Sequence, residues 1–91
     1  MSVTRNSRSI IMTADNDAIA GRFHVTEMYL ALDGATASAA FSITETGGAV
    51  IGAGGLQGTD GRQDLITVPK WVDGIVADVL PANVQLVVLT D

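Results

Sequence analysis

Apolar residues in this chain alternate with polar or small residues more often than they recur at intervals of three and four, which favours strands over helices. The clearest alternation covers residues 36–44, where the larger apolar side chains are those of Phe41 and Ile43 and the smaller ones those of Ala37 and Ala39. This pattern predicts a strand with one apolar face and one small-polar face.

A second strand is predicted over Arg22–Leu32, a segment rich in β-forming residues. Its apolar positions are odd-numbered up to Val25 and even-numbered from Met28. A bulge near residues 26–27 explains this change of phase, and burial of both faces of the strand explains it equally well. The preceding segment, Ala18-Ile19-Ala20, fits either a short turn or a strand.

The end of the chain has two β-rich runs, Gly74–Leu80 and Val84–Thr90, separated by Pro81-Ala82-Asn83. We predict that they form a terminal hairpin. Pro81 is expected to end the first of these strands because proline has no N–H to donate to a neighbouring strand.

Turn signals separate short apolar runs throughout the chain. The turn pairs are Asp33-Gly34, Gly47-Gly48, Asp60-Gly61 and Asp73-Gly74, and the further strand candidates are Ser9–Thr13, Ala49–Ala53 and Asp64–Val68. About six or seven short strands with a turn roughly every 8 to 12 residues are typical of sandwiches and jelly rolls. The sequence therefore predicts one all-β domain over residues 9–91, a small antiparallel β-sandwich or jelly-roll-like fold, preceded by an extended N-terminal arm over residues 1–8.

Composition adds an expectation about partners. Charged residues make up 16 % of the 91 residues, whereas the surface of a soluble monomer this small carries about a quarter to a third. We therefore expect part of the surface to face other subunits. The chain contains no cysteine, which excludes a disulfide framework, a thiolate metal site and a cysteine nucleophile.

Charge is distributed unevenly along the chain. Arg5 and Arg8 lie in an acid-free leader, whereas the residues from Ser9 onward carry three bases and ten acids. An acidic body repels phosphate groups, so we expect no direct nucleic-acid binding by the folded part. The leader lacks the apolar run of a signal peptide, and no segment approaches the roughly 20 apolar residues of a membrane-spanning helix. We therefore expect no membrane contact.

Two motifs resemble ligand loops but lack required residues. The glycine-rich segment 47–58 has no Gly-Lys-Ser/Thr sequence and no complete dinucleotide fingerprint, so a glycine-rich hairpin or surface loop is favoured over a phosphate site. Asp15-Asn16-Asp17 has alternate oxygen ligands, but the glycine and glutamate of a calcium loop are missing. A solvated turn is the favoured interpretation, and we expect neither a metal nor a cofactor.

Candidate catalytic and binding residues are few. His24 is the only histidine, and its strand neighbours indicate a partly exposed strand residue rather than a catalytic or zinc-binding one. Glu27 and Glu45 are acids on predicted strands, and their spacing alone does not show that the two carboxylates face one reacting bond of a substrate. Trp71 fits either an exposed contact residue or a cap on the core, and an oligomer interface satisfies both alternatives.

Several segments together resemble a known class of protein. They are Gly21-Arg22-Phe23 at a strand entrance, an Ala/Ser-rich strand leading into Glu45-Thr46-Gly47-Gly48, the glycine-rich loop, and the ending Trp71–Leu80 with Val84–Leu89. From Gly21 to the last residue the chain resembles small β-sandwich proteins of tailed bacteriophage particles, in which an Asp-Gly-apolar turn leads into a final hairpin. The resemblance implies a non-enzymatic virion protein, most simply a capsid decoration or cement protein, and transfers no catalytic residues.

The resemblance also implies partners. We expect a homotrimer, with a homodimer as second choice, in contact with the major capsid protein or other virion proteins after synthesis in the host cytoplasm. The expected interface residues are Arg5, Arg8, Tyr29 and Trp71. The leader carries no motif of the resemblance, so the expectation that its two arginines meet an acidic neighbour rests on their charge alone. The alternatives are a tail or baseplate component, and a small ligand- or carbohydrate-binding module that uses Trp71 and Tyr29.

Overall fold

The computed structural model describes residues 3–91 and contains strands and turns but no helix in that range. The strands are β1 (Val3–Arg5), β2 (Ser9–Met12), β3 (Ala18–Asp33), β4 (Ala40–Thr44), β5 (Val50–Gly55), β6 (Asp60–Ile66), β7 (Lys70–Val79) and β8 (Val84–Thr90). Every pairing between them is antiparallel. The predicted all-β antiparallel fold is therefore confirmed. A helix long and apolar enough to cross a membrane is not found in the described part of the chain.

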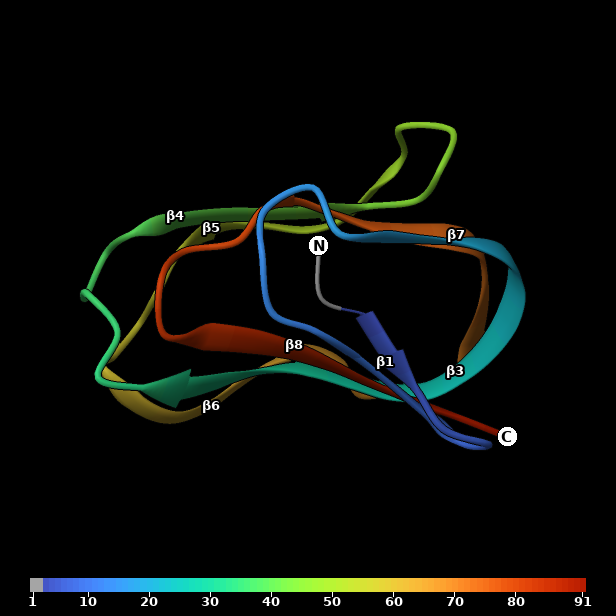
Figure 1. Ribbon diagram of the computed structural model, residues 1–91, viewed down its shortest axis with the longest axis horizontal. Coiled ribbons are helices and arrows are strands. Elements are labelled where there is room, and N and C mark those ends of the chain that lie inside the picture. The colour runs from blue at the N-terminus through green and yellow to red at the C-terminus, as the bar shows by residue number, and fades with distance from the viewer. Residues whose placement is uncertain (1–2) are drawn as a thin grey trace.

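The long strand β3 connects two layers of one continuous sheet, whose order is β1-β2-β8-β3-β7-β4-β5, with β6 also paired to β3. The first part of β3 pairs with β7, from Ala18 opposite Val76 to Val25 opposite Lys70. The second part pairs with β8, from Val25 opposite Thr90 onward, and with β6 on its other side. β3 bends between these parts and carries the sheet from one layer to the other (Figure 1).

A bulge marks the bend in β3. The register against β8 shifts between Val25 and Glu27, and the Thr26 hydroxyl donates a hydrogen bond to the Leu89 carbonyl over 3.1 Å. The extra residue changes which side chains face the core: the buried residues are odd-numbered up to Val25 and even-numbered from Met28. Of the two explanations left open for the phase change of the apolar pattern, the bulge near residues 26–27 is the one that the register shows. Ala18-Ile19-Ala20, for which turn and strand were left open, begins the same strand.

The predicted terminal hairpin is wrong. β7 and β8 do not pair with each other because β3 lies between them. The Leu80–Asn83 connection instead crosses from the upper layer to the lower one, as the orange-red segment of Figure 1 shows. The Asn83 carbonyl accepts the Asp33 N–H over 3.1 Å, which anchors the connection to the end of β3. Both β7 and β8 pair with β3, so the Leu80–Asn83 connection between them is a crossover rather than a tight turn.

Two predicted turns and the predicted start of one strand also differ from the structure. Asp60-Gly61 and Asp73-Gly74 lie inside β6 and β7, where the glycines have φ values of 92° and 76° and bend the strands locally. The strand predicted over residues 36–44 begins only at Ala40. Ser38 has a φ of 67°, and its N–H donates to the Leu56 carbonyl over 2.9 Å, so the preceding residues form a turn.

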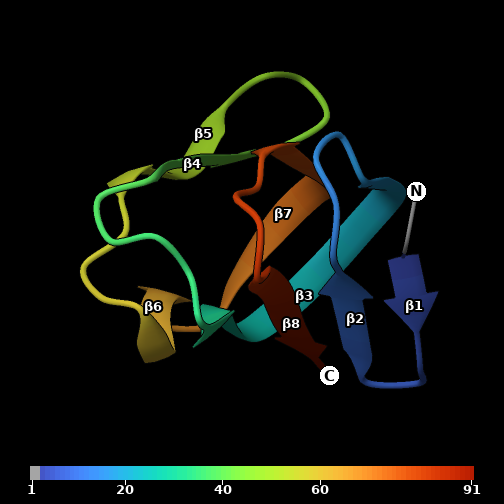
Figure 2. The same cartoon turned by 60° about the vertical axis from the view of Figure 1, so that its left-hand side comes forward.

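The N-terminal segment was expected to extend as an arm over residues 1–8. Residues 3–5 are extended, but they form β1 and pair with residues 10–12 of β2, so this segment lies on the sheet as an edge strand. Figure 2 shows the β1–β2 hairpin at one side of the molecule. Residues 1 and 2 lie outside the described part of the chain.

The core lies between the two layers and consists of aliphatic side chains, methionines and two phenylalanines. Its most deeply buried members are Ile10, Met12, Val25, Met28, Leu30, Ile43, Val72, Ile75, Leu86 and Val88. They come from β2, β3, β4, β7 and β8, and most are separated by two positions within a strand, as a one-sided sheet requires. Burial of these side chains from both layers is the main force that holds the layers together.

Asp17 is the one buried charged residue among residues 3–91. Its Oδ2 atom accepts the N–H groups of Ala14 over 3.0 Å and Thr13 over 3.2 Å. Its backbone carbonyl accepts the Ala77 N–H over 2.8 Å. The Asp15-Asn16-Asp17 segment was predicted to be a solvated turn. It is a turn between β2 and β3, but Asp17 itself is buried, because its carboxylate supplies acceptors for N–H groups that no strand satisfies.

We predict that Asp17→Ala lowers the free energy of unfolding by about 2 to 3 kcal/mol, because two part-buried N–H groups lose a charged acceptor that is itself buried. Urea denaturation measures the effect. Asp78→Ala is the matched control, since Asp78 is exposed on β7, and a change within about 0.5 kcal/mol is expected there. Equal losses in the two variants would contradict the structural role of Asp17.

A second prediction concerns Gly74, where a Cβ atom would overlap the Thr46 hydroxyl and lie 2.9 Å from the Thr46 Cβ. Gly34→Ala provides the comparison, because Gly34 has a similar φ of 72° but no atom within 4 Å of an added Cβ. Gly34→Ala should cost about 1 kcal/mol for the backbone conformation alone. Gly74→Ala should cost a further 1 to 3 kcal/mol, roughly, for overpacking. Identical midpoints of urea denaturation for Gly74→Ala and Gly34→Ala would refute the steric contribution of Thr46.

Candidate functional site

Two of the four predicted interface residues, Arg5 and Trp71, line the same open cavity of about 320 Å³. Its other lining residues are Ser7, Arg22, Phe23, His24, Thr90 and Asp91. These residues come from β1, the turn after it, the first part of β3, the start of β7 and the end of the chain. The fold therefore gathers segments that are far apart in the sequence at the end of the molecule where β3 bends, on the right of Figure 1.

The pairing of β3 with β7 positions the central side chains. His24 lies opposite Trp71 and Arg22 lies opposite Asp73 in the antiparallel register. Since Phe23 and Val72 point into the core, their neighbours in each strand point outward. Arg22, His24 and Trp71 consequently share the outer face of the upper layer beside the bend.

Trp71 is a surface residue, 56 % exposed. The Arg22 guanidinium lies 5.0 Å from its ring centroid, and the His24 ring lies 4.9 Å away at an angle of 41°. Of the two alternatives left open for Trp71, the cap on the core is excluded because Val72 occupies the inward position. These neighbours fix the orientation of the indole while leaving more than half of its surface accessible.

Two of the five basic residues of the chain, Arg5 and Arg22, line this cavity, and the backbones of Arg8 and Lys70 lie next to residues that line it. Arg5 stacks on Phe23 at 5.0 Å, and Arg22 lies over Trp71. The Arg8 carbonyl accepts the N–H of Thr90, which lines the cavity. Thr90 and Lys70 lie on the two sides of Val25, because Val25 pairs with Thr90 of β8 and with Lys70 of β7. We call the group Arg5, Arg8, Arg22, His24, Lys70 and Trp71 the basic end.

Two carboxylates accompany the basic end. The Asp91 carboxylate contacts His24 Nδ1, and an Asp73 oxygen lies 3.9 Å from Arg22 Nε. The Arg22–Asp73 pair is well exposed, with 68 % and 81 % of the two side chains accessible, so it adds little to stability. The residues named here comprise four cations and these two carboxylates, and the Glu45 carboxylate accepts the Asp73 N–H over 2.9 Å, on a chain whose net charge is −5. The arrangement suits contact with a negatively charged surface.

The sequence pattern did not identify Arg22, Lys70 or Asp91 as members of this group, and it gave His24 no binding role. Arg22 and His24 could have been placed on the outer face, because they alternate with the buried residues Phe23 and Val25. Asp91 carried no such signal, since its contact with His24 spans 67 residues and depends on the β3–β8 pairing.

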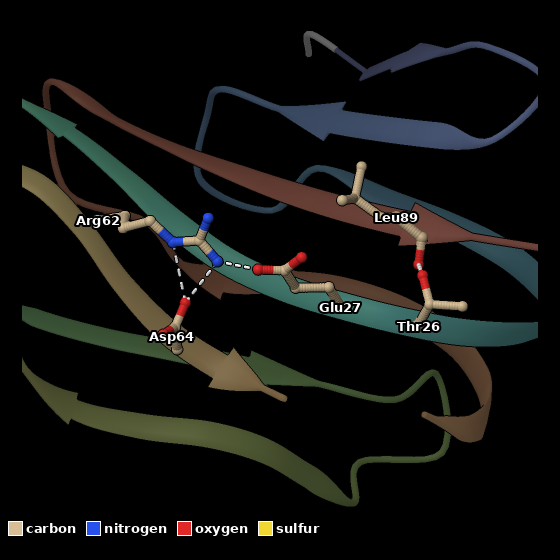
Figure 3. A network of polar contacts seen from close by, with 5 residues as sticks. All are labelled: Thr26, Glu27, Arg62, Asp64 and Leu89. Carbon is tan, nitrogen blue, oxygen red and sulfur yellow. Dashed lines mark hydrogen bonds and ion pairs between the residues drawn. The ribbon is translucent and has the colours of Figure 1, made fainter. Parts of the chain in front are cut away.

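Tyr29, the fourth predicted interface residue, lies apart from the basic end on the outer face of the lower layer. The Arg62 guanidinium stacks over its ring at 4.0 Å. Figure 3 shows Arg62 held between Glu27, on β3, and Asp64, with a 2.7 Å contact from Nη2 to the Asp64 carboxylate. Arg62 thus ties β6 to β3 and covers part of the tyrosine. Arg8, by contrast, is exposed in the turn between β1 and β2.

A metal site is not formed by the described residues: no three of their histidine, aspartate and glutamate side chains lie together. Within residues 3–91, the hydrogen bond between His24 and Asp91 is the only one that the His24 side chain makes. A second cavity of about 330 Å³, at the other end of β3, is lined by Thr13, Ala31, Leu32, Asp33, Asn83, Val84 and Gln85. Its one charged side chain is Asp33.

Comparison with known proteins gave no match to a protein-family model, a curated protein or a solved structure.

The adjacent residues Trp71 and Val72 should respond differently to truncation. Val72→Ala is expected to lower the free energy of unfolding by about 2 kcal/mol because a buried side chain leaves a cavity. Trp71→Ala should cost less than about 1 kcal/mol because the indole lies on the surface. Guanidinium denaturation followed by far-ultraviolet circular dichroism measures both variants without relying on tryptophan fluorescence. A larger loss for Trp71→Ala would mean that the indole supports the fold.

Proposed function

We propose that this protein is a non-enzymatic structural component of a tailed-bacteriophage particle, most simply a capsid decoration protein, and that the basic end attaches it to a neighbouring protein. The observation that carries the proposal is Trp71, held by Arg22 and His24 with 56 % of its surface exposed. Tryptophan and arginine are the residue types that most often dominate binding energy in protein interfaces. Their placement on paired strands keeps the contact surface rigid, which lowers the entropy cost of docking.

The charge of the basic end indicates the chemistry of the partner. Arg5, Arg8, Arg22 and Lys70 favour an acidic protein surface, and the acidic remainder of the chain disfavours approach in the opposite orientation. Asp73 and Asp91 interrupt the positive surface, which suits a mixed protein surface better than the uniform charge of a nucleic acid backbone. The resemblance of residues 21–91 to phage β-sandwich proteins supplies the particle as the setting.

We predict that purified phage particles contain the protein in a fixed ratio to the major capsid protein, as quantitative mass spectrometry would show. Recombinant protein should sediment with particles that lack it. Trp71→Ala should weaken this binding at least about ten-fold, since truncating a tryptophan hot spot costs about 2 kcal/mol or more. Raising the salt concentration should also weaken binding, because the charges are exposed and screened.

Arg22→Ala and Arg62→Ala form the matched pair for this experiment. Each removes one arginine that lies over an aromatic ring, but only Arg22 belongs to the basic end. Arg22→Ala should weaken sedimentation with particles, whereas Arg62→Ala should not. Equal binding by both variants would count against the basic end as the attachment surface. Absence of the protein from purified particles would reject the virion role itself, and quenching of Trp71 fluorescence by sugars would instead favour the carbohydrate-binding alternative.

A further inference from the structure

The sheet has three free edges among the described residues, and they differ in how well they are protected. β1 is three residues long and includes Arg5. β6 carries Asp60, Arg62 and Asp64. Short edge strands and charged side chains are the usual means by which proteins prevent unwanted strand pairing. β5 has neither protection: its sequence, Val50-Ile51-Gly52-Ala53-Gly54-Gly55, contains no charge and no proline.

Only one side of β5 is occupied. It pairs with β4 from Thr44 opposite Val50 to Ala40 opposite Gly55, and it ends the strand order of the sheet. In an antiparallel ladder every second residue of an edge strand directs its N–H and C=O away from the partner strand. β6 approaches β5 through the Leu65 side chain, which lies 3.1 Å from where a Gly52 Cβ would be, but β6 forms its backbone ladder with β3. The outer backbone groups of β5 are therefore free to bind another strand.

We propose that β5 pairs with β5 of a second copy of this chain, antiparallel and about a two-fold axis. Self-pairing satisfies the outer backbone groups of both strands and brings no like charges together. The other two edges suit β5 less well as partners: β1 is short, and β6 would place its charges beside an uncharged strand. The pairing joins the β5-β4-β7-β3 layers of two copies into one continuous layer.

The side chains of β5 are compatible with this contact. The register against β4 shifts at Ile51, since Val50 lies opposite Thr44 and Gly52 lies opposite Ile43. Pairing centred on Gly52 of both copies, with Ile51 as the extra residue, would therefore place Val50 opposite Ala53 of the second copy. Val50 is 65 % exposed in the single chain, so the contact would remove apolar surface from water. The flanking strand β4 also has no charged residue and would add uncharged surface. Gly54, with a φ of 144°, ends the regular part of the strand, so we expect the ladder to cover Val50–Ala53.

The small size of the contact sets its strength. A stable interface buries about 800 Å² on each partner, which would be about one sixth of the 4816 Å² surface of this chain. One four-residue ladder with its flanks covers less than that. We therefore expect a dimer that dissociates in the micromolar range. The dimer is the second of the two oligomeric states expected from the sequence, because pairing of identical edges closes after two copies.

Sedimentation-velocity ultracentrifugation of the full chain tests the proposal. The wild-type protein should shift from monomer to dimer between about 1 and 100 µM. Val50→Lys should raise the dissociation constant at least about ten-fold, because it brings two positive charges to the paired edges. Val68→Lys is the matched control, since Val68 is a 73 % exposed valine outside the strands, and it should leave the dissociation constant unchanged. Circular dichroism checks that both variants are folded.

A distance measurement keeps the proposal falsifiable if Val50→Lys fails to fold. The chain has no cysteine, so Ala53→Cys provides a unique position for a nitroxide label. Labels in the two copies should lie within about 20 Å of each other, because adjacent strands are about 4.8 Å apart. Trp71→Ala should still dimerise, which separates this contact from the basic end. The proposal would be overturned by a monomer at about 100 µM, the top of the concentration range given above, or by a trimer. Equal effects of the two lysine substitutions, or labels that lie far apart, would overturn it as well.

Discussion

The continuous pairing of β3 with both layers is the constraint on which the rest of the structure depends. Val25 belongs to both pairings, since it lies opposite Lys70 of β7 and opposite Thr90 of β8. A strand shared in this way fixes the distance and orientation between the layers, because its backbone cannot slide in one ladder without breaking the other. The buried side chains of Val25 and Met28, on either side of the bulge, then anchor the bend in the core.

The same constraint produces the basic end. The bend brings the start of β7, the end of β8 and the β1–β2 hairpin to one end of the molecule. Outward-facing side chains of these segments must then lie side by side, even though they come from residues 5 to 91 of the sequence. Trp71 is exposed for a local reason as well, because strand alternation assigns the inward position to Val72. Position at the bend and strand alternation together create an exposed aromatic residue among cations.

The charges are distributed over the surface in a way that separates two kinds of contact. Exposed cations with an aromatic residue lie at the bend, where salt-dependent recognition of an acidic surface is favoured. The β4–β5 side has no charged strand residue, and contact there would depend on backbone hydrogen bonds and apolar area. The low proportion of charged residues in the chain is thus concentrated in part of the surface.

The sequence by itself determined the all-β class and most strand positions, because these follow from alternation within about ten residues. The same alternation offered the bulge near residues 26–27 as one of two explanations of the phase change, and it could have placed Arg22 and His24 on the outer face. The sequence did not determine which strands pair. The terminal hairpin prediction was wrong because β7 and β8 each pair with β3, which lies between them. Asp17 was expected in a solvated turn because the segment lacks the other residues of a calcium loop, and the pairing of its backbone with Ala77, remote in sequence, was not foreseen. The contact of His24 with Asp91, the burial of Asp17 and the free edge of β5 were decided by tertiary structure, because each depends on which strand the bend of β3 brings alongside.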